Sequence, residues 1–514
     1  MGRAVQSDAG ETGYLRDVTY VRQFSKELAP LAVRAAAALN GFAPPPADDF
    51  DYCELGCGTG DTANTLAAAY PRARFVGVDF NGEHVTFARG LAGRGGLGNV
   101  RFVERDFAQL SDETLPDFDY VCAHGVLSWI APETRGALLD FAAARLKPGG
   151  LLYITYNALP GWAAVEPLRR LMHDASAGVE GGSLDRARHG AGVASLLCEA
   201  GAEYFASNPA AKELLYTALQ MGLPYTAHEY FGAHWQPMYF ADVAAEMTRR
   251  GLGFIGQLPL YLNYRDLTIP PSAMELFRQV GDRATFESLK DFAINEFFRG
   301  DVYVKGSSPR DVDVTRGYLE TTRFGTLTAA EHVKREVHLR HHVLRFEGPL
   351  FDALIDRLGR DAAAVPELLD EPALAGYGDE ALRQAVLRLL LGEQIAPMQA
   401  GSHRVPWEYN RRILEQRLST KDPVVLASPV AGTGIVVPTL QAVALRLMTG
   451  VDAADWPAWI RAFVARQPVR LKVGDRSVET EEGQVRVLLE ELEKFRATRM
   501  PKLVALGVVE APGP

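Results

Sequence analysis

The sequence predicts an α/β protein in which a doubly wound parallel sheet precedes a mostly helical middle region and an α+β C-terminal region. Two observations predict the sheet. Short apolar runs alternate with helix-like segments between residues 50 and 157, and a glycine-rich loop follows the first run. Such alternation builds a parallel sheet with helices on both faces. A third observation is the length of 514 residues, which exceeds what one core supports, so we expect two to four domains.

The elements of this sheet follow one another in order. Helical spacing of Leu28, Leu31, Ala35 and Leu39 predicts a helix over 14–41, which Gly41 ends, and Pro44–Pro46 form a rigid spacer. The apolar runs predict strands at Phe50–Leu55, Phe75–Asp79, Val100–Glu104, Tyr120–Ala123 and Leu151–Thr155. Helices are expected between them at Thr62–Ala69, His84–Leu91 and Glu133–Leu146.

The alternation fades after residue 163. Residues 164–220 are alanine-rich and read as helical, and residues 221–305 are aromatic-rich and mixed. Residues 401–514 hold a further unit with a charged helix near 484–498. We therefore expect domains at 1–165, 166–305 and 306–514, the last winged-helix-like.

Composition limits the function classes. A net charge of -10 does not suit a general nucleic-acid binder, which needs a basic face. No apolar run approaches the roughly 20 residues of a membrane span, and residues 1–13 lack the apolar core of a signal peptide. The four cysteines form no C-x-x-C pair, which favours buried thiols in a reduced, cytoplasmic protein. His338, His341 and His342 lie in a charged segment without matching cysteines or carboxylates, so we expect an exposed helix there and no metal site.

The strongest motif is Glu54-Leu-Gly-Cys-Gly-Thr-Gly60, between a predicted strand and a predicted helix. Its glycines allow a tight turn and a close approach of the backbone to a ligand. The dinucleotide fingerprint requires glycine or alanine where Asp61 stands, and a carboxylate at this helix start would repel a pyrophosphate. It would not repel a zwitterionic methionine group. The loop therefore favours S-adenosylmethionine over NAD.

Three further motifs follow in order. Asp79 ends the second strand, where a carboxylate can accept two hydrogen bonds from a ribose diol. Asp106 and Phe107 follow the third strand, where an acid can accept the adenine amino group and a ring can cover the base. Leu146-Lys-Pro-Gly-Gly150 predicts a tight turn before the fifth strand.

Together these motifs resemble Rossmann-like class I S-adenosylmethionine-dependent methyltransferases over about residues 50–157. The resemblance implies that the cofactor is held by Glu54, Gly56, Cys57, Gly58, Gly60, Asp79, Phe80, Asp106 and Phe107. His124 and Gly125, at the end of the fourth strand, complete the predicted cofactor set in this domain.

Acceptor chemistry is expected at the carboxyl ends of the fourth and fifth strands. The Asn/Asp-Pro-Pro-aromatic motif of many amino-methylating relatives is absent there, which disfavours DNA-base and glutamine methylation. His124, Tyr156, Asn157 and Trp162 can instead converge on the methyl group. His124 fits a general base or a neighbour of the cofactor. Tyr156 and Trp162 fit an aromatic channel for an alkyl-ammonium or plain core packing.

A narrower resemblance covers most of the chain. His124–Trp129, Tyr156-Asn157, His228–Phe231 and Phe298–Val304 are similar to motifs of bacterial methyltransferases with a methyltransferase regulatory domain, which include protein lysine methyltransferases. The resemblance implies that the middle domain approaches the active site through His228, Glu229 or Tyr230, although a domain-interface network fits these residues slightly better. It also implies that Tyr20 reaches the carboxylate of the cofactor.

Three functions remain open from the sequence. The leading one is methylation of a protein or peptide, on lysine, because the large accessory regions offer docking area. The second is a small-molecule N- or O-methyltransferase whose extra domains form a lid and a homodimer interface. The third is a regulatory module that senses the cofactor without turnover.

Overall fold

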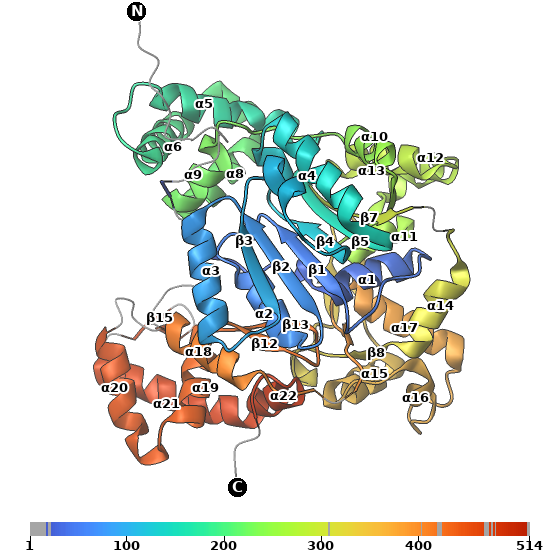
Figure 1. Cartoon of the computed structure of the whole chain (residues 1–514). Helices are drawn as coiled ribbons and strands as arrows, with labels where there is room; N and C mark the ends of the chain where they lie inside the picture. The colour runs from blue at the N-terminus through green and yellow to red at the C-terminus, as the bar shows by residue number, and fades with distance from the viewer. Residues whose placement is uncertain are drawn as a thin grey trace, which may run out of the picture.

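A mixed seven-stranded sheet lies at the centre of the computed structural model, with helices on both faces (Figure 1). The structure describes residues 17–18, 22–306, 309–401, 403–418, 424–466, 472–473, 476–478 and 480–510. The strand order is β3-β2-β1-β4-β5-β7-β6. The strands are β1 (Asp51–Leu55), β2 (Arg74–Asp79), β3 (Val100–Glu104), β4 (Phe118–Ala123), β5 (Leu146–Asn157), β6 (Leu252–Leu258) and β7 (Phe298–Lys305).

The first five strands are parallel, as predicted, but the sheet does not end with them. β7 pairs antiparallel with β5, and β6 pairs antiparallel with β7. Both added strands come from the stretch that the sequence assigns to a middle domain, so the two regions share one sheet. The parallel sheet predicted from residues 50–157 is therefore confirmed, and it continues into an antiparallel edge that the sequence did not predict, because such an edge needs no local βαβ pattern.

Strict alternation along the strands divides the core into two faces. Tyr52 and Tyr153 belong to one buried cluster, whereas their chain neighbours Cys53 and Ile154 belong to the other. The first face packs against α1 (Pro30–Leu39) and α2 (Asp61–Ala69), and the second against α4 (Pro132–Arg145) and α10 (Phe240–Arg249). Helix α3 (Gly82–Arg94) packs against β2 and β3. The carboxyl ends of the strands stay open for a ligand.

A helical insert follows β5 and stands beside those strand ends. It comprises α5 (Glu166–Ser176), α6 (Ser183–Glu199), α7 (Glu203–Ser207), α8 (Pro209–Met221) and α9 (Leu223–Phe231). These helices share a core of their own, which includes Trp162 and Tyr230. The helical character predicted for residues 164–220 is confirmed. Helices α11 (Arg265–Thr268), α12 (Met274–Arg278) and α13 (Arg283–Ile294) lie between β6 and β7.

The C-terminal region packs on the α1 and α2 side of the sheet (Figure 1). Its helices are α14 (Val312–Thr321), α15 (Pro349–Arg360), α16 (Val365–Leu369), α17 (Asp379–Leu391), α18 (Trp407–Arg417), α19 (Thr439–Gly450), α20 (Trp456–Arg466), α21 (Glu481–Thr498) and α22 (Met500–Ala505). Short two-stranded sheets lie among them: β8 (Arg323–Gly325) with β11 (Ala396–Met398), β9 (Glu336–His338) with β10 (Val343–Arg345), β12 (Val424–Ser428) with β13 (Thr433–Val437), and β14 (Lys472–Val473) with β15 (Arg476–Ser477). The buried cluster under α2 runs on without a break into α18, β12 and α21, so the N-terminal and C-terminal parts share one core.

Three local expectations need correction. The predicted helix over 14–41 begins only at Pro30 in the described residues, because residues 22–25 have no regular secondary structure and only a short 3₁₀ turn at Lys26–Leu28 precedes Pro30. Residues 146–150 belong to β5, with an irregular register against β4, rather than to a free turn. The segment of His338 is a β-hairpin and not a helix, since β9 and β10 pair antiparallel there.

Two sequence-based exclusions concern membranes and metals. Within the described ranges, no helix is long and apolar enough to cross a membrane. The same residues contain no group of three or more histidine, cysteine or acidic side chains placed to hold a metal ion. All four cysteines are buried and free of disulfides.

Candidate active site

The glycine loop between β1 and α2 is held by the carboxylate that ends β2. Gly56, Gly58 and Gly60 all have positive φ, of 78°, 52° and 69°. Residues that have a Cβ adopt this backbone conformation only at a cost in free energy. Asp79 accepts the backbone N–H of Gly58 at 2.9 Å with one oxygen and that of Asn81 at 2.9 Å with the other. A Cβ added at Gly58 would meet no atom within 4 Å, so the loop opens toward a cavity.

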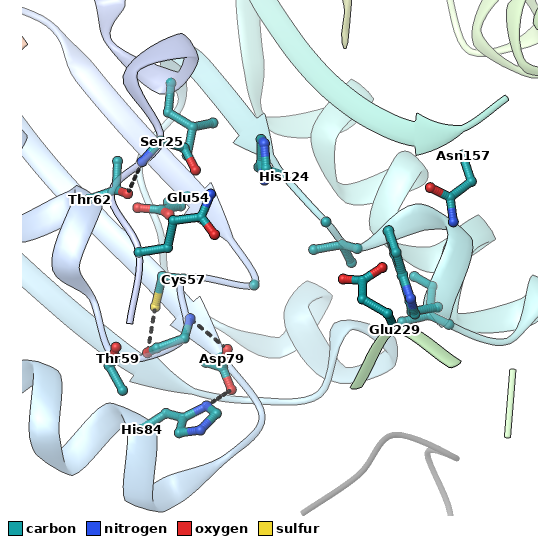
Figure 2. A pocket seen from close by; sticks show the side chains of 18 of the residues that line it. Ser25, Glu54, Cys57, Thr59, Thr62, Asp79, His84, His124, Asn157 and Glu229 are labelled. Atoms are coloured by element: carbon teal, nitrogen blue, oxygen red, sulfur yellow. Dashed lines mark hydrogen bonds and ion pairs between the residues drawn. The ribbon is translucent and has the colours of Figure 1, made fainter. Parts of the chain in front are cut away.

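That cavity has a volume of about 420 Å³ and lies at the carboxyl ends of the parallel strands (Figure 2). Its wall brings together most of the predicted site residues: Glu54, Gly56, Cys57, Gly58, Asp79, Phe80, Asp106, Phe107, His124, Gly125, Asn157, Trp162 and Glu229. Figure 2 shows Glu54 and Asp79 on one side, Asn157 and Glu229 on the other, and His124 between them. We call the wall around Glu54 and Asp79 the loop side of the cavity, and the wall around Asn157 and Glu229 the far side.

Three predicted residues of the described part of the chain lie elsewhere. Tyr156 is fully buried and donates to Asp301 at 2.8 Å instead of facing the cavity. His228 is buried too, and its Nε2 donates to the Val18 carbonyl at 2.8 Å. Gly60 caps the start of α2 and does not line the wall. Tyr20 lies outside the described residues.

Burial shifts the protonation of two groups in the wall. Desolvation, together with the nearby carboxylates of Asp61 and Asp79, raises the pKa of Glu54 to about 8. One oxygen of this carboxyl, Oε2, is buried without a hydrogen-bond partner. Desolvation lowers the pKa of His124 to about 4, so its imidazole is neutral at pH 7.

Aromatic rings build the far side of the cavity. Trp162 stacks on Phe297 with ring centroids 4.2 Å apart, and Phe298 lies 6.0 Å from the ring of His124. Asn157, at the end of β5, is opposite Phe298 in the β5–β7 pairing. The start of β7 and the residue before it, Phe298 and Phe297, therefore supply two rings of the wall, next to polar groups from the parallel strands.

Comparison with known proteins identifies the family. A model of a methyltransferase domain matches residues 53–152, and a model of a predicted methyltransferase regulatory domain matches residues 224–305. The protein sll1526 of Synechocystis is 30% identical over 506 residues, which cover 96% of this chain and 99% of that protein. The chain belongs to the class I S-adenosylmethionine-dependent methyltransferases that carry a methyltransferase regulatory domain.

Two other comparisons bear on this methyltransferase. The structure of PKMT2 from Rickettsia typhi in complex with AdoHcy aligns with a TM-score of 0.69 over 93% of this chain and 98% of that one, at 17% identity. This likeness confirms the predicted Rossmann-like fold. A trans-aconitate 2-methyltransferase of Deinococcus radiodurans is 32% identical over 105 residues, which cover only 20% of this chain and 37% of that enzyme.

The loop side of the cavity fits S-adenosylmethionine, the cofactor of the family. The open space above Gly58 leaves room for a ligand against the backbone. The unpartnered oxygen of Glu54 can accept the cofactor's ammonium group, which would also compensate the buried charge of the ionised carboxylate. Asp79 for the ribose, and Asp106 with Phe107 for the adenine, are our proposed assignments.

The methyltransferase pocket also contains residues that sequence analysis did not select. Gln23, Ser25 and Leu28 come from the irregular segment and the 3₁₀ turn before α1. Leu214 and Tyr225 come from the helical insert, and Phe297 and Phe298 lie just before and at the start of β7. His84 lines the wall with its Nδ1 3.6 Å from Asp79. Two family-like segments of the sequence lie close to some of these residues: Phe298–Val304 begins at one of them, and His228–Phe231 follows Tyr225.

Proposed function

We propose that this methyltransferase N-methylates the side-chain amine of lysine in a protein or peptide. One observation carries the proposal: the described lining of the pocket contains no lysine or arginine, but it includes the carboxyl groups of Glu54, Asp61, Asp79, Asp106 and Glu229. Such a wall attracts a cationic acceptor and offers a carboxylate-rich acceptor no binding partner. Structural likeness to the protein lysine methyltransferase PKMT2 supports the same reading.

The two sides of the pocket come largely from different parts of the chain, before and after residue 165. Residues 1–165 supply the loop side, Asn157 and Trp162. Residues 166–305 supply Leu214, Tyr225, Glu229, Tyr230, Phe297 and Phe298. We propose that the middle region is the acceptor-binding half of the enzyme. Cytoplasmic location and a homodimer stay predictions.

The far side of the pocket suits an extended alkyl-ammonium. Glu229 pairs with the ammonium group, and the rings of Trp162 and Phe297 pack along the alkyl chain and exclude water. Desolvation by these walls lowers the pKa of the bound amine, and its proton leaves to water before the methyl group is transferred. The bound cofactor supplies a methyl group that its sulfonium already activates. His124, neutral and too weak a base to take a proton from an ammonium, is a neighbour of the bound cofactor.

The experiment that tests this function is methyl transfer from labelled S-adenosylmethionine into a lysate of the source cells, separated into protein and small-molecule fractions. We expect label on lysine in protein bands, located by mass spectrometry. Label in the small-molecule fraction alone would overturn the proposal and favour a small-molecule methyltransferase whose helical insert acts as a lid.

A matched pair of variants tests the acceptor side. Glu229→Gln removes the charge from the pocket wall, whereas Glu213→Gln removes a charge from the exposed surface of α8 beside Leu214. We expect Glu229→Gln to raise the KM for a lysine peptide roughly tenfold or more, because hydrogen bonds to charged groups contribute about 1.5–3 kcal/mol. AdoHcy affinity should stay unchanged, and Glu213→Gln should behave like wild type. An unchanged KM in Glu229→Gln would contradict this role.

A further inference from the structure

The carboxylate of Asp61 is a junction between three distant parts of the chain. Asp61 is the first residue of α2, directly after the glycine loop, and it lines the pocket. Arg22 donates to it twice, through Nε at 3.1 Å and Nη2 at 2.6 Å. Arg417 donates through Nη2 at 2.8 Å, and the Thr59 hydroxyl of the loop donates at 2.7 Å. The exposed fractions are 9% for the Asp61 side chain, 14% for Arg22 and 6% for Arg417.

Arg417 brings the C-terminal region to this junction. Arg417 is the last residue of α18 and lies 356 residues from Asp61 in the sequence. The same helix contacts α2 one turn further on, where the Tyr409 hydroxyl lies 3.0 Å from Thr65 Oγ1. Because both contacts reach the helix that starts at the glycine loop, the position of α18 fixes the start of that helix.

Arg22 brings the N-terminal segment to the same carboxylate. The residues just after it, Gln23, Ser25 and Leu28, line the pocket on the loop side. The Ser25 N–H donates to Thr62 Oγ1 at 3.2 Å, so this segment is attached to the start of α2 at two points. Two guanidinium groups meet at one largely buried carboxylate. Removal of either one leaves Asp61 with less compensation for its lost solvation.

We propose that Arg417 is a positioning residue of the cofactor site: it holds Asp61, and through Asp61 it fixes both the glycine loop and the N-terminal segment that closes the pocket. The C-terminal region thereby sets cofactor affinity although Arg417 itself does not line the cavity. This role is independent of the acceptor, because every contact in the junction lies on the loop side.

The test compares two variants of α18 in the full-length protein. Arg417→Ala removes the contact with Asp61, and Tyr409→Phe removes only the hydroxyl contact with Thr65 on the same pair of helices. We expect Arg417→Ala to raise the Kd for AdoHcy about tenfold, measured by calorimetry, with the acceptor KM unchanged at saturating cofactor. Tyr409→Phe should lower the melting temperature without a change in Kd.

A conservative substitution of Arg417 distinguishes two roles: positioning Asp61 in the cofactor site, and only attaching the C-terminal region to the sheet. Arg417→Lys keeps a cation near Asp61 and should hold the Kd within about threefold of wild type, whereas Arg417→Gln should show the full loss. If Arg417→Ala lowers the melting temperature but leaves the Kd unchanged, Arg417 only docks the C-terminal region and the proposal is overturned. If the alanine variant does not fold, equal Kd values in Arg417→Gln and Arg417→Lys overturn it as well.

Discussion

The hydroxyl of Tyr156 on β5 donates a 2.8 Å hydrogen bond to the Asp301 carboxylate on β7, and both side chains are fully buried. Asp301 also accepts a hydrogen bond from Arg299 Nε at 2.9 Å, and Arg299 continues the network to Asp291 on α13. Tyr156 is therefore part of the ionic core that attaches the antiparallel edge to the parallel sheet. Its chain neighbour Asn157 faces the pocket, since successive side chains of a strand point to opposite faces.

Tyr156→Phe is expected to destabilise the protein without affecting the cofactor site. Loss of the hydroxyl leaves the buried Asp301 with one donor fewer, which costs roughly 1–3 kcal/mol of unfolding free energy. Urea unfolding measures this loss, and calorimetry with AdoHcy should give the wild-type Kd. A changed Kd with unchanged stability would place Tyr156 in the active site after all.

Asp79→Ala is expected to weaken cofactor binding by about 1–3 kcal/mol, or roughly 5- to 150-fold in Kd. The variant removes the proposed acceptor of the ribose diol and also frees the N–H groups of Gly58 and Asn81. Asp112→Ala, which removes an exposed carboxyl group at the end of the 3₁₀ helix Phe107–Asp112, is the matched control and should bind AdoHcy as wild type does. If the two variants bind alike, the cofactor assignment of Asp79 is wrong.

The loop side of the pocket could be predicted because its chemistry is local in the sequence. Asp79 is the last residue of a strand, and Gly56, Gly58 and Asp106 lie within three residues after one, and parallel strands bring their carboxyl ends to one edge. The end of each apolar run in the sequence therefore indicates where a residue that binds the ligand lies. For the same reason the five parallel strands were predicted to within a few residues.

The far side could not be predicted, because it depends on contacts between residues that are distant in the sequence. Phe297 and Phe298 reach the pocket only through the pairing of β7 with β5, and Leu214 reaches it through the packing of the helical insert. Tyr156 was misplaced for another reason. Both faces of β5 are buried, so an apolar pattern does not indicate which of Tyr156 and Asn157 faces the ligand.

His124 is expected to act as a neighbour of the reacting groups and not as a general base. Burial lowers its pKa to about 4, whereas a lysine ammonium has a pKa of ~10.4, so proton transfer between them is uphill by roughly 9 kcal/mol. The pH profile of kcat should therefore contain no step near pH 6.5 that is due to His124. Around that pH, the profiles of wild type and His124→Ala should have the same shape. In that variant turnover and AdoHcy affinity should fall together. A large loss of turnover at constant Kd would restore the base role.

Glu54→Gln is expected to stabilise the cofactor-free protein increasingly as the pH rises. Burial raises the pKa of Glu54 from an ordinary value near 4.5 to about 8, so between these pH values the folded state binds more protons than the unfolded state. The free energy of unfolding of the wild type therefore falls across this range, by at most about 1.4 kcal/mol per pH unit from this group, and levels off above pH 8. The variant lacks this titration.

Urea unfolding at pH 5, 6, 7 and 8 without cofactor measures the difference in stability between variant and wild type. We expect a difference that grows in favour of Glu54→Gln up to pH 8, while the exposed substitution Glu213→Gln gives a constant difference near zero. The same Glu54→Gln protein should bind AdoHcy more weakly, because the amide cannot supply the charge that an ammonium group requires. If the difference in stability does not depend on pH, Glu54 is ionised in the cofactor-free folded protein. The proposal that the cofactor's ammonium group compensates its buried charge would then be wrong.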